Sequence, residues 1–388
     1  MTSLALSHGF GFNDLYARDG LVRLDAAFVG WLKEAHVDLH ARLLAARAAP
    51  EALPDKEESN LLIELARPLE DFVGQMFGVG AEAAALRARH NALAPIFDCK
   101  RLFVQRYVTR AIKPEQAVLL DGVEVTAALP PSLALGDDLE AFELAFALAV
   151  REAAGPEFKV AAPTPEIDVF ARYAAWALHA PEGKARHRAG PLFKVPHKLD
   201  MEHLVPIETE VVDGVTRMRL PRPLLRHREG FALTDSGCDL VQALDQSNYC
   251  IWCHNQGKDS CSRGLKDRKT GAFQKSPFGV TLAGCPLEEK ISEMNLLKSE
   301  GFSIGALAMA AVDNPLLAAT GHRICNDCMK ACIYQKQEPV DIPQIETRTL
   351  KDVLGLPWGF EIYSLLTRWN PLNLRRPLPR PLTGRTVL

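Results

Sequence analysis

Long apolar runs are missing from this 388-residue sequence, and with them the usual signature of a membrane protein. The apolar run Ala145–Val150 falls far short of the roughly 18 residues that suggest a membrane-spanning helix. The N-terminus has no basic segment followed by an apolar block, so we expect no signal peptide. The net charge of −3 argues against nucleic-acid binding by the chain as a whole. We therefore expect a cytoplasmic protein that binds neither membrane nor nucleic acid.

Motifs for substrate chemistry are equally scarce. The sequence holds no GxGxxG turn, no Walker loop and no Ser/His/Asp constellation. Four histidines (His187, His197, His203 and His227) are scattered without the spacing of metal ligands, which favours ordinary core or surface positions. We therefore expect no catalytic residue and no dinucleotide-binding turn within the chain.

Cysteine is present in an uneven pattern. Seven of the nine cysteines lie in one segment, as two short clusters with a single Cys-Pro between them: Cys250, Cys253 and Cys261, then Cys285, then Cys325, Cys328 and Cys332. Thiols at such spacings can face one point, as a soft metal or an iron–sulfur cluster requires. Because no export signal is present, ligation is favoured over disulfide bonding. Cys99 lies in an apolar helical segment and Cys238 on the helix before Cys250; both are interpreted as packing residues, although Cys238 could be a spare ligand.

Three kinds of metal site are possible interpretations of the seven thiols. A structural zinc site needs four ligands, commonly two CxxC pairs, whereas residues 325–332 read CxxCxxxC. The radical-generating motif CxxxCxxC has the opposite order of spacings. Two [4Fe–4S] clusters with interleaved ligands fit the count best, since a Cys-Pro cysteine can ligate the neighbouring cluster. Cys285 then completes a set of four with Cys325, Cys328 and Cys332, and residues 250–261 remain one ligand short.

A resemblance to a known family rests on residues between Cys285 and Glu346. The elements are, in order, Cys285-Pro286-Leu287, a helix, Asn314-Pro315, Thr320-Gly321-His322-Arg323-Ile324-Cys325, Cys328, Cys332 and Val340-x5-Glu346. Together they resemble the N-terminal iron–sulfur domain of the glutamate synthase small subunit, which is similar to a domain of dihydropyrimidine dehydrogenase. The resemblance covers about 245–350, a quarter of the chain. Cys325 and Cys328 stand closer together than in that family, which leaves open which cysteines share a cluster.

The resemblance implies an α-helical ferredoxin domain with two [4Fe–4S] clusters. It makes Cys285, Cys325, Cys328 and Cys332 the ligands of one cluster. Cys250, Cys253 and Cys261 would hold the other, with Glu346 as its fourth ligand. In that family the domain precedes an FAD/NAD(P)H module of the pyridine-nucleotide-disulfide oxidoreductase type. FAD and NAD(P)H would therefore reach this chain only through a downstream segment or a partner.

These inferences give a function and an alternative from another class. The resemblance implies an electron-transfer module of an NAD(P)H/FAD-dependent oxidoreductase, with a flavoprotein segment or subunit and an electron-acceptor protein or domain as partners. The alternative is a zinc-stapled protein-interaction module. Its binding surface would be the basic insertion at 262–284, which that family lacks; the insertion could also steer an acidic electron partner or be a solvated loop.

The remaining pattern predicts a mainly α fold with small hairpins. Apolar residues at helical spacing predict helices before residue 110 and over 138–154, and from Ile291 onward. Asp-Gly pairs predict hairpins at 118–125 and 208–220. Thr234 or Asp235 is expected to cap the helix that leads into the cysteines. We expect a helical region of unknown function over 1–235 and the iron–sulfur domain over 236–350. A Pro/Arg-rich linker over 351–388 would end at the start of a flavin-domain strand, Pro381–Leu388.

Overall fold

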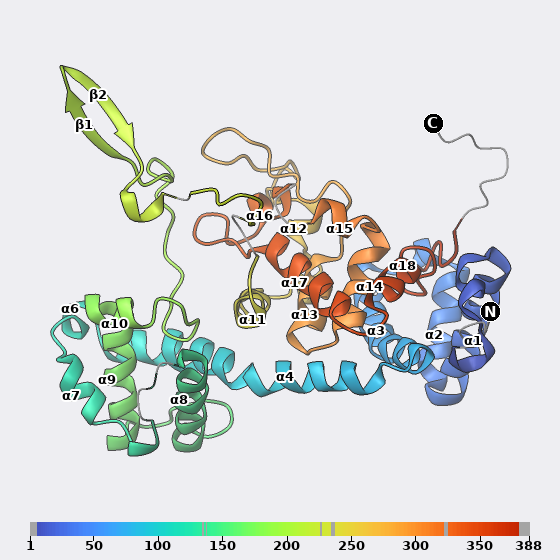
Figure 1. Cartoon of the computed structure of the whole chain (residues 1–388), viewed down its shortest axis with the longest axis horizontal. Coiled ribbons are helices and arrows are strands. Elements are labelled where there is room, and N and C mark those ends of the chain that lie inside the picture. The colour runs from blue at the N-terminus through green and yellow to red at the C-terminus, as the bar shows by residue number, and fades with distance from the viewer. Residues whose placement is uncertain are drawn as a thin grey trace.

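A computed structural model describes residues 6–133, 136, 138–225, 227–233, 237–321 and 325–379. Helices dominate these residues, and the named strands form one hairpin, which confirms the mainly α prediction (Figure 1). The α-helices are α1 (Arg18–Ala35), α2 (Val37–Ala48), α3 (Asp55–Phe77), α4 (Gly80–Asp98), α5 (Thr109–Ala111), α6 (Pro114–Ala117), α7 (Gly122–Ala127), α8 (Leu139–Ala154), α9 (Pro165–His179), α10 (Pro181–Arg186), α11 (Leu240–Tyr249), α12 (Ser260–Arg263), α13 (Ile291–Ser299), α14 (Ser303–Asp313), α15 (Leu317–Thr320), α16 (Asp327–Ala331), α17 (Ile342–Leu354) and α18 (Gly359–Leu366). The other elements are the π-helix η4 (Cys99–Val108), the 3₁₀ helices η1 (Ser7–Gly9), η2 (Phe12–Tyr16), η3 (Pro50–Ala52), η5 (Pro131–Leu133), η6 (Arg222–Leu224) and η7 (Cys253–Gln256), and the strands β1 (Glu208–Val212) and β2 (Val215–Arg219).

The hydrophobic core has two parts. One part, which we call the body, combines buried residues of 10–83 with buried residues of 250–374. The other, the lobe, is built from residues 93–193 together with Leu240 and Leu244 of α11. The long helix α4 runs from the body into the lobe (Figure 1). The predicted boundary between residues 235 and 236 therefore does not follow the cores, because the first 83 residues share a core with the cysteine segment.

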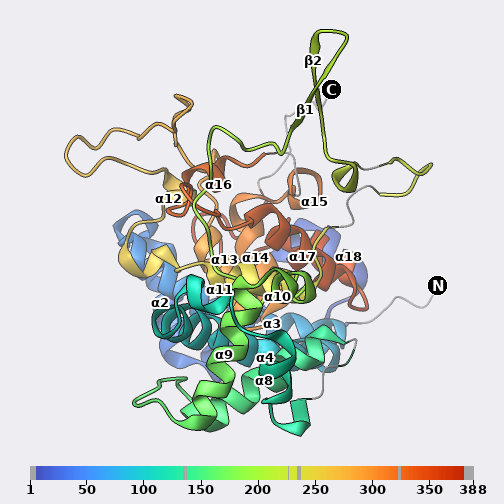
Figure 2. The same ribbon diagram turned by 90° about the vertical axis from the view of Figure 1, so that its left-hand side faces the viewer.

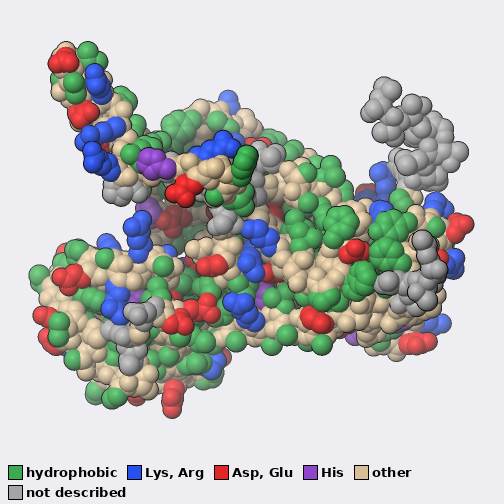
Figure 3. Space-filling model, in the orientation of Figure 1, with side chains coloured by type: hydrophobic (Ala, Val, Ile, Leu, Met, Phe, Trp, Pro, Cys, Tyr) green, Lys and Arg blue, Asp and Glu red, His purple; other side chains and the backbone are tan. Residues whose placement is uncertain are grey.

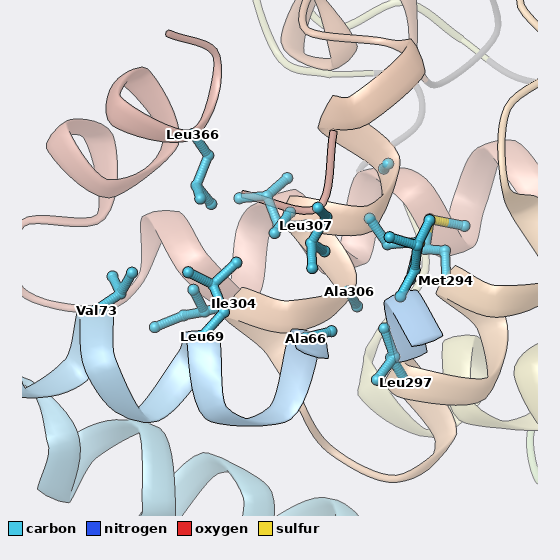
Figure 4. Packing of buried hydrophobic residues seen from close by; sticks show 14 of the residues in the cluster. Ala66, Leu69, Val73, Met294, Leu297, Ile304, Ala306, Leu307 and Leu366 are labelled. Atoms are coloured by element: carbon cyan, nitrogen blue, oxygen red, sulfur yellow. The ribbon is translucent and has the colours of Figure 1, made fainter. Parts of the chain in front are cut away.

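The body is organised around α3 and α14. Figure 4 shows Ala66, Leu69 and Val73 of α3 facing residues of α14, with side chains of α13 and α18 beside them. α14 is rich in small residues, and a Cβ on Gly305 would lie only 2.8 Å from the carbonyl oxygen of Ala66. The close approach therefore requires glycine at this position.

The segment after α17 also belongs to the body. Trp369 is fully buried, its indole Nε1–H donates to Asp25 Oδ1 at 3.0 Å, and the Asn370 amide donates to the carbonyl of Ala308 at 2.8 Å. Leu372 and Leu374 are buried as well. Residues 351–374 are thus part of a packed core rather than the linker that their proline and arginine content predicts.

A charged network lies inside the body where α4, α13 and α17 meet. The Lys298 ammonium has no exposed surface; it donates to His90 Nε2 at 2.8 Å and pairs with Asp352. Arg348, one turn before Asp352, donates to the same carboxylate at 2.7 Å. Each charge therefore has a partner, which is the condition for burying it without a large penalty.

His90 gives this network a predicted pH dependence. Burial, and then the Lys298 charge, lower its pKa from 6.5 to about 4. Between pH 6.5 and 4, His90 is protonated in the unfolded chain but neutral in the folded chain. The free energy of unfolding should therefore fall as the pH drops from about 6.5 to 4. A gap of this size corresponds to roughly 3 kcal/mol. Urea denaturation at pH 7.5 and pH 5 should show a smaller loss in His90→Gln than in the unchanged chain; equal losses would contradict the prediction.

One of the two predicted hairpins, at residues 118–125 in the lobe, is wrong. Residues 122–127 form helix α7, because the Asp121 carboxylate accepts hydrogen bonds from the backbone N–H groups of Val123 and Glu124 at 2.7 and 3.0 Å. This is helix N-capping, for which Asp is well suited. The Asp-Gly pair at this position therefore starts a helix rather than a turn between strands.

The second predicted hairpin is confirmed. β1 and β2 pair antiparallel, and the turn residues Asp213 and Gly214 both have positive φ (52° and 78°), as a type I′ turn requires. The hairpin stands away from the body and the lobe (Figures 2 and 3), with acidic and basic side chains along it. Arg219 pairs across it with Glu208 and Glu210 at 3.2 and 3.3 Å.

Two further predictions concern the start of α11 and the C-terminal residues. α11 begins at Leu240, where Asp239 accepts from the backbone N–H of Gln242 at 2.8 Å, whereas Thr234 and Asp235 lie outside the described residues. Pro381–Leu388 also lies outside them. Among the helices that are described, none is both long and apolar enough to cross a bilayer.

Candidate metal centre

Four of the predicted ligands surround one cavity. Cys250, Cys253, Cys261 and Cys332 line a small cavity of about 10 Å³ and are all buried. They come from separate short elements: Cys250 follows α11, Cys253 begins η7, Cys261 lies in α12 and Cys332 follows α16. Packing of α12 against α16 brings the last two together. We call this set of four thiols the first site.

Backbone N–H groups face the sulfurs of the first site. Trp252 has a left-handed backbone (φ 51°), and its N–H lies 3.4 Å from Cys250 Sγ. The backbone N–H of Ser260 is directed at Cys253, and those of Tyr334 and Val340 at Cys332. Such donors favour thiolate and are among the features that set the potential of iron–sulfur clusters.

Burial acts in the opposite direction on the same thiols. It raises the pKa of Cys250 to about 11 and that of Cys253 to about 12. Burial also raises the pKa of Cys261, whose Sγ donates to Asp259 Oδ1 at 2.8 Å. These groups stay protonated at neutral pH unless a bound metal displaces the protons, and metal binding to thiols does this.

A buried amide beside the first site lacks hydrogen-bond partners. Asn295 is fully buried on α13 and lines the cavity, and neither its Nδ2 nor its Oδ1 makes a hydrogen bond of normal geometry among the described residues. Its amide is close enough to Cys250 to lower the pKa of that thiol. A buried amide, inward-facing N–H groups and four thiols are the kinds of group that surround the sulfurs of a four-thiolate iron–sulfur site.

Three further predicted ligands and one additional carboxylate interact electrostatically with one another next to the first site. Burial raises the pKa of Cys328, and the nearby groups Glu346, Cys285 and Glu289 raise it further. The backbone N–H groups of Glu289 and Leu287 face Cys285 and oppose the effect of burial on its pKa. We call Cys285, Cys328, Glu346 and Glu289 the second site. The N–H of Cys285 donates to the carbonyl of Cys261 at 2.9 Å, so the two sites are direct neighbours.

The two carboxylates of the second site are deeply buried. Burial, followed by the charge of Asp341, raises the pKa of Glu346 to about 7. The pKa of Glu289 is also raised, first by burial and then by Glu346. Two adjacent carboxyl groups without a cation between them repel each other, so a bound metal would relieve this repulsion. Glu289 was not among the predicted ligands, although its place four residues after Cys285 could have suggested it.

The structure exchanges two of the predicted ligands between the sites. The sequence predicts Cys332 in the second site, but its side chain lines the cavity of the first. The sequence predicts Glu346 in the first site, but its carboxylate interacts with Cys328 of the second. The physical reason is the end of α16 at Ala331. Cys332 has a non-helical backbone (φ −53°, ψ 142°), so its side chain leaves the helix face that carries Cys328.

Three further cysteines are not among the groups that the structure brings together at these two sites. Cys325 is exposed, and residues 322–324 before it lie outside the described residues. As predicted, Cys99 is fully buried in the lobe core; Cys238 is half-buried and donates to the carbonyl of Gln344 at 3.4 Å. Within the described ranges, no group of three or more His, Cys, Asp or Glu side chains is arranged tightly enough for a single metal ion.

Comparisons with known proteins find similarity in the N-terminal helices and along most of the chain. Residues 6–78 match the family described as the RP005 N-terminal alpha-helical domain. Uncharacterized protein RP005 of Rickettsia prowazekii (strain Madrid E) is 29% identical over 311 residues, covering 76% of this chain and 99% of that protein. Uncharacterized protein RP006 of the same organism is 64% identical over 73 residues, 19% of this chain and only 10% of its own length. No solved structure matches the chain significantly.

These findings overturn the family assignment made from residues 285–346. The chain is similar to RP005 along nearly the whole length of that protein, and its N-terminal helices match the RP005 domain. Membership of the glutamate synthase small-subunit family is therefore wrong. The short cysteine motifs that suggested it are a spacing pattern, and a spacing pattern alone does not identify a family.

Proposed function

We propose that this chain is a cytoplasmic iron–sulfur electron-transfer module that holds two [4Fe–4S] clusters and relays single electrons between a flavin and an acceptor. The observation that carries the proposal is the convergence of four buried free thiols on one cavity, with backbone N–H groups directed at their sulfurs. A single buried cysteine is ordinary packing, but four around one cavity are not explained by packing.

The residues of each site have defined roles in this proposal. In the first site four thiolates would hold one cluster. In the second, Cys285 and Cys328 would supply thiolates and Glu346 a carboxylate, and Cys325 would complete the set. An oxygen ligand is harder than sulfur and shifts the potential of the cluster that it binds. When bound, the clusters supply one-electron redox chemistry.

The surrounding helices would control that chemistry. α13 and α14 place fully buried apolar residues behind the sites, including Ile291, Met294 and Leu307. Such a wall excludes water, while the N–H groups around the sulfurs stabilise the thiolate charge. The hydrogen bond between Cys285 and Cys261 joins the two sites through the backbone, so one electron would have a short path from one cluster to the other.

The electron donor and acceptor would come from partners. NAD(P)H gives up electrons as hydride, and a flavin converts this into single-electron steps; FAD and NAD(P)H would be supplied by a flavoprotein segment or subunit. The exposed loop at 262–284 carries Arg268, Lys269 and Lys275 and would steer an acidic partner towards the sites.

Cluster content is the direct test. Because each [4Fe–4S] cluster takes four ligands, anaerobic analysis should find about eight irons and eight sulfides per chain. The chain should be brown and should bleach with dithionite. A colourless chain with stoichiometric zinc would contradict the proposal and support the alternative of a zinc-stapled interaction module.

A further inference from the structure

A larger cavity lies against the first site. It has a volume of about 440 Å³ and is enclosed by residues of the lobe, of α11 and of the segment that follows α16. Cys250 and Tyr334 line both this cavity and the small cavity of the first site. A volume of this size is within the range of small-molecule sites. The cavity therefore places a potential ligand directly beside a proposed cluster.

The π-helix η4 supplies the charge of this cavity. In a π-helix the N–H of each residue bonds to the carbonyl five residues earlier, so side chains five apart lie near each other; Lys100 and Gln105 form one such pair, and Arg101 and Arg106 the other. All four line the cavity. Ten residues of π-helix are unusual, and π-helical turns are frequently found at functional sites.

The cations of η4 outnumber the carboxylates that they face. Three of them line the cavity against one acid, Asp245, which pairs with Lys100 at 2.6 Å. Arg101 pairs with Asp98 at 3.0 Å, outside the cavity lining. Arg106 is exposed and has no ion pair within the described part of the chain. The cavity thus has a surplus of positive charge, which favours an anionic ligand.

The cavity lining is also aromatic. The rings of Tyr249 and Tyr334 stack with centroids 4.6 Å apart and planes 15° apart. The Tyr249 hydroxyl is fixed by donating to the carbonyl of Glu338 at 2.9 Å. Trp252 also lines the cavity, and its buried indole Nε1–H has no acceptor among the described residues. Fixed aromatic faces are suited to a flat ring.

We propose that this cavity binds a planar aromatic anion. Its ring would pack against Tyr334 and Trp252, and its anionic group would meet Arg101 and Arg106. Binding itself stands on the geometry of the cavity. The role of the ligand rests on the proposed function: it would exchange one electron with the first cluster, so that one of the two would be oxidised by one electron while the other is reduced by one.

Binding to the intact, anaerobically purified chain tests the proposal. Titration calorimetry would use two planar anions of different origin, anthraquinone-2-sulfonate and flavin mononucleotide. Their uncharged counterparts are 2-hydroxymethylanthraquinone and riboflavin. At least one anion should bind, at least tenfold more tightly than its uncharged counterpart, because charge-assisted contacts are the stronger ones. The preferred anion tells a quinone-like ligand from a flavin-like one.

Two variants and a matched control locate the site. Arg106→Gln should weaken binding of the anion roughly tenfold, and Tyr334→Leu should weaken binding of both the anion and its uncharged counterpart. Arg110→Gln removes an exposed arginine just beyond η4 that does not line the cavity, and it should change nothing.

The outcomes separate this proposal from the relay. Absence of binding by both anions, or binding that both variants leave unchanged, overturns the proposed ligand site. Iron analysis of the same samples reports on the relay independently. Iron without anion binding would overturn only the cavity proposal, and anion binding without iron would overturn only the relay.

Discussion

Replacing Cys332 by alanine is expected to remove half of the iron from the chain. The structure places this thiol in the first site, so the variant should lose that cluster and retain about four irons in the second, by the four-ligand rule. The expected effect is large because a cubane cluster does not survive in a buried site with a missing ligand and no water to replace it. Iron and sulfide analysis, with the electron paramagnetic resonance spectrum of the reduced chain, measures it.

Double variants decide how the ligands are divided. Cys332→Ala combined with Cys250→Ala should hold as much iron as either single variant, because both residues belong to one site. Cys332→Ala combined with Cys328→Ala should hold almost none. The division expected from the sequence gives the reverse pattern, so the two alternatives cannot both survive this experiment. Cys99→Ala, which lies in the lobe core, serves as the control and should keep the full iron content.

Lys298→Met is expected to destabilise the body by about 3–5 kcal/mol, the usual effect of removing one partner of a buried ion pair. Methionine keeps the unbranched shape of the lysine side chain as far as Cε and lacks only the terminal atom, so the loss reports mainly the charge rather than a cavity. Asp352 would keep Arg348, at 2.5 Å, as a partner, which places the expected effect near the lower end of this range. His90 would also lose its donor at Nε2.

Urea denaturation measures this effect, and a surface lysine provides the control. Lys33 is exposed on α1, and Lys33→Met should change the free energy of unfolding by less than about 0.5 kcal/mol. A Lys298→Met chain as stable as the unchanged one would mean that an apolar side chain compensates for the lost pair, as happens when whole buried ion pairs are replaced.

Local patterns predicted local structure well. Apolar residues at helical spacing located α8, α13 and α14, and Gly301 lies between the last two with a φ of +85°, as a residue after a helix often does. Identical Asp-Gly pairs had opposite outcomes at residues 121 and 213. The difference comes from Asp121, whose carboxylate caps a helix, and a dipeptide does not reveal which role its side chain takes.

The cysteine spacing predicted that several thiols gather in one part of the fold, but not how they are divided between the two sites. Cys328 and Cys332 are four residues apart, which on a continuous helix would place both on one face. They separate because α16 ends between them, and a boundary shift of one residue is beyond what sequence patterns resolve. Glu289 escaped prediction because its approach to Glu346 depends on how α17 packs, a contact between residues 57 positions apart.

The divided core of the body has a consequence for the making of the protein. Helices α1–α3 are synthesised before the side chains that cover them; Trp369, for example, follows Asp25 by 344 residues. At about 5–20 residues per second, this interval lasts on the order of 15–60 s. The lobe, which lies between the two halves of the sequence of the body, can fold during that time. The apolar faces of α1–α3 stay exposed until the later core residues have been synthesised. A nascent chain of this length would therefore benefit from a chaperone that shields these faces during the interval.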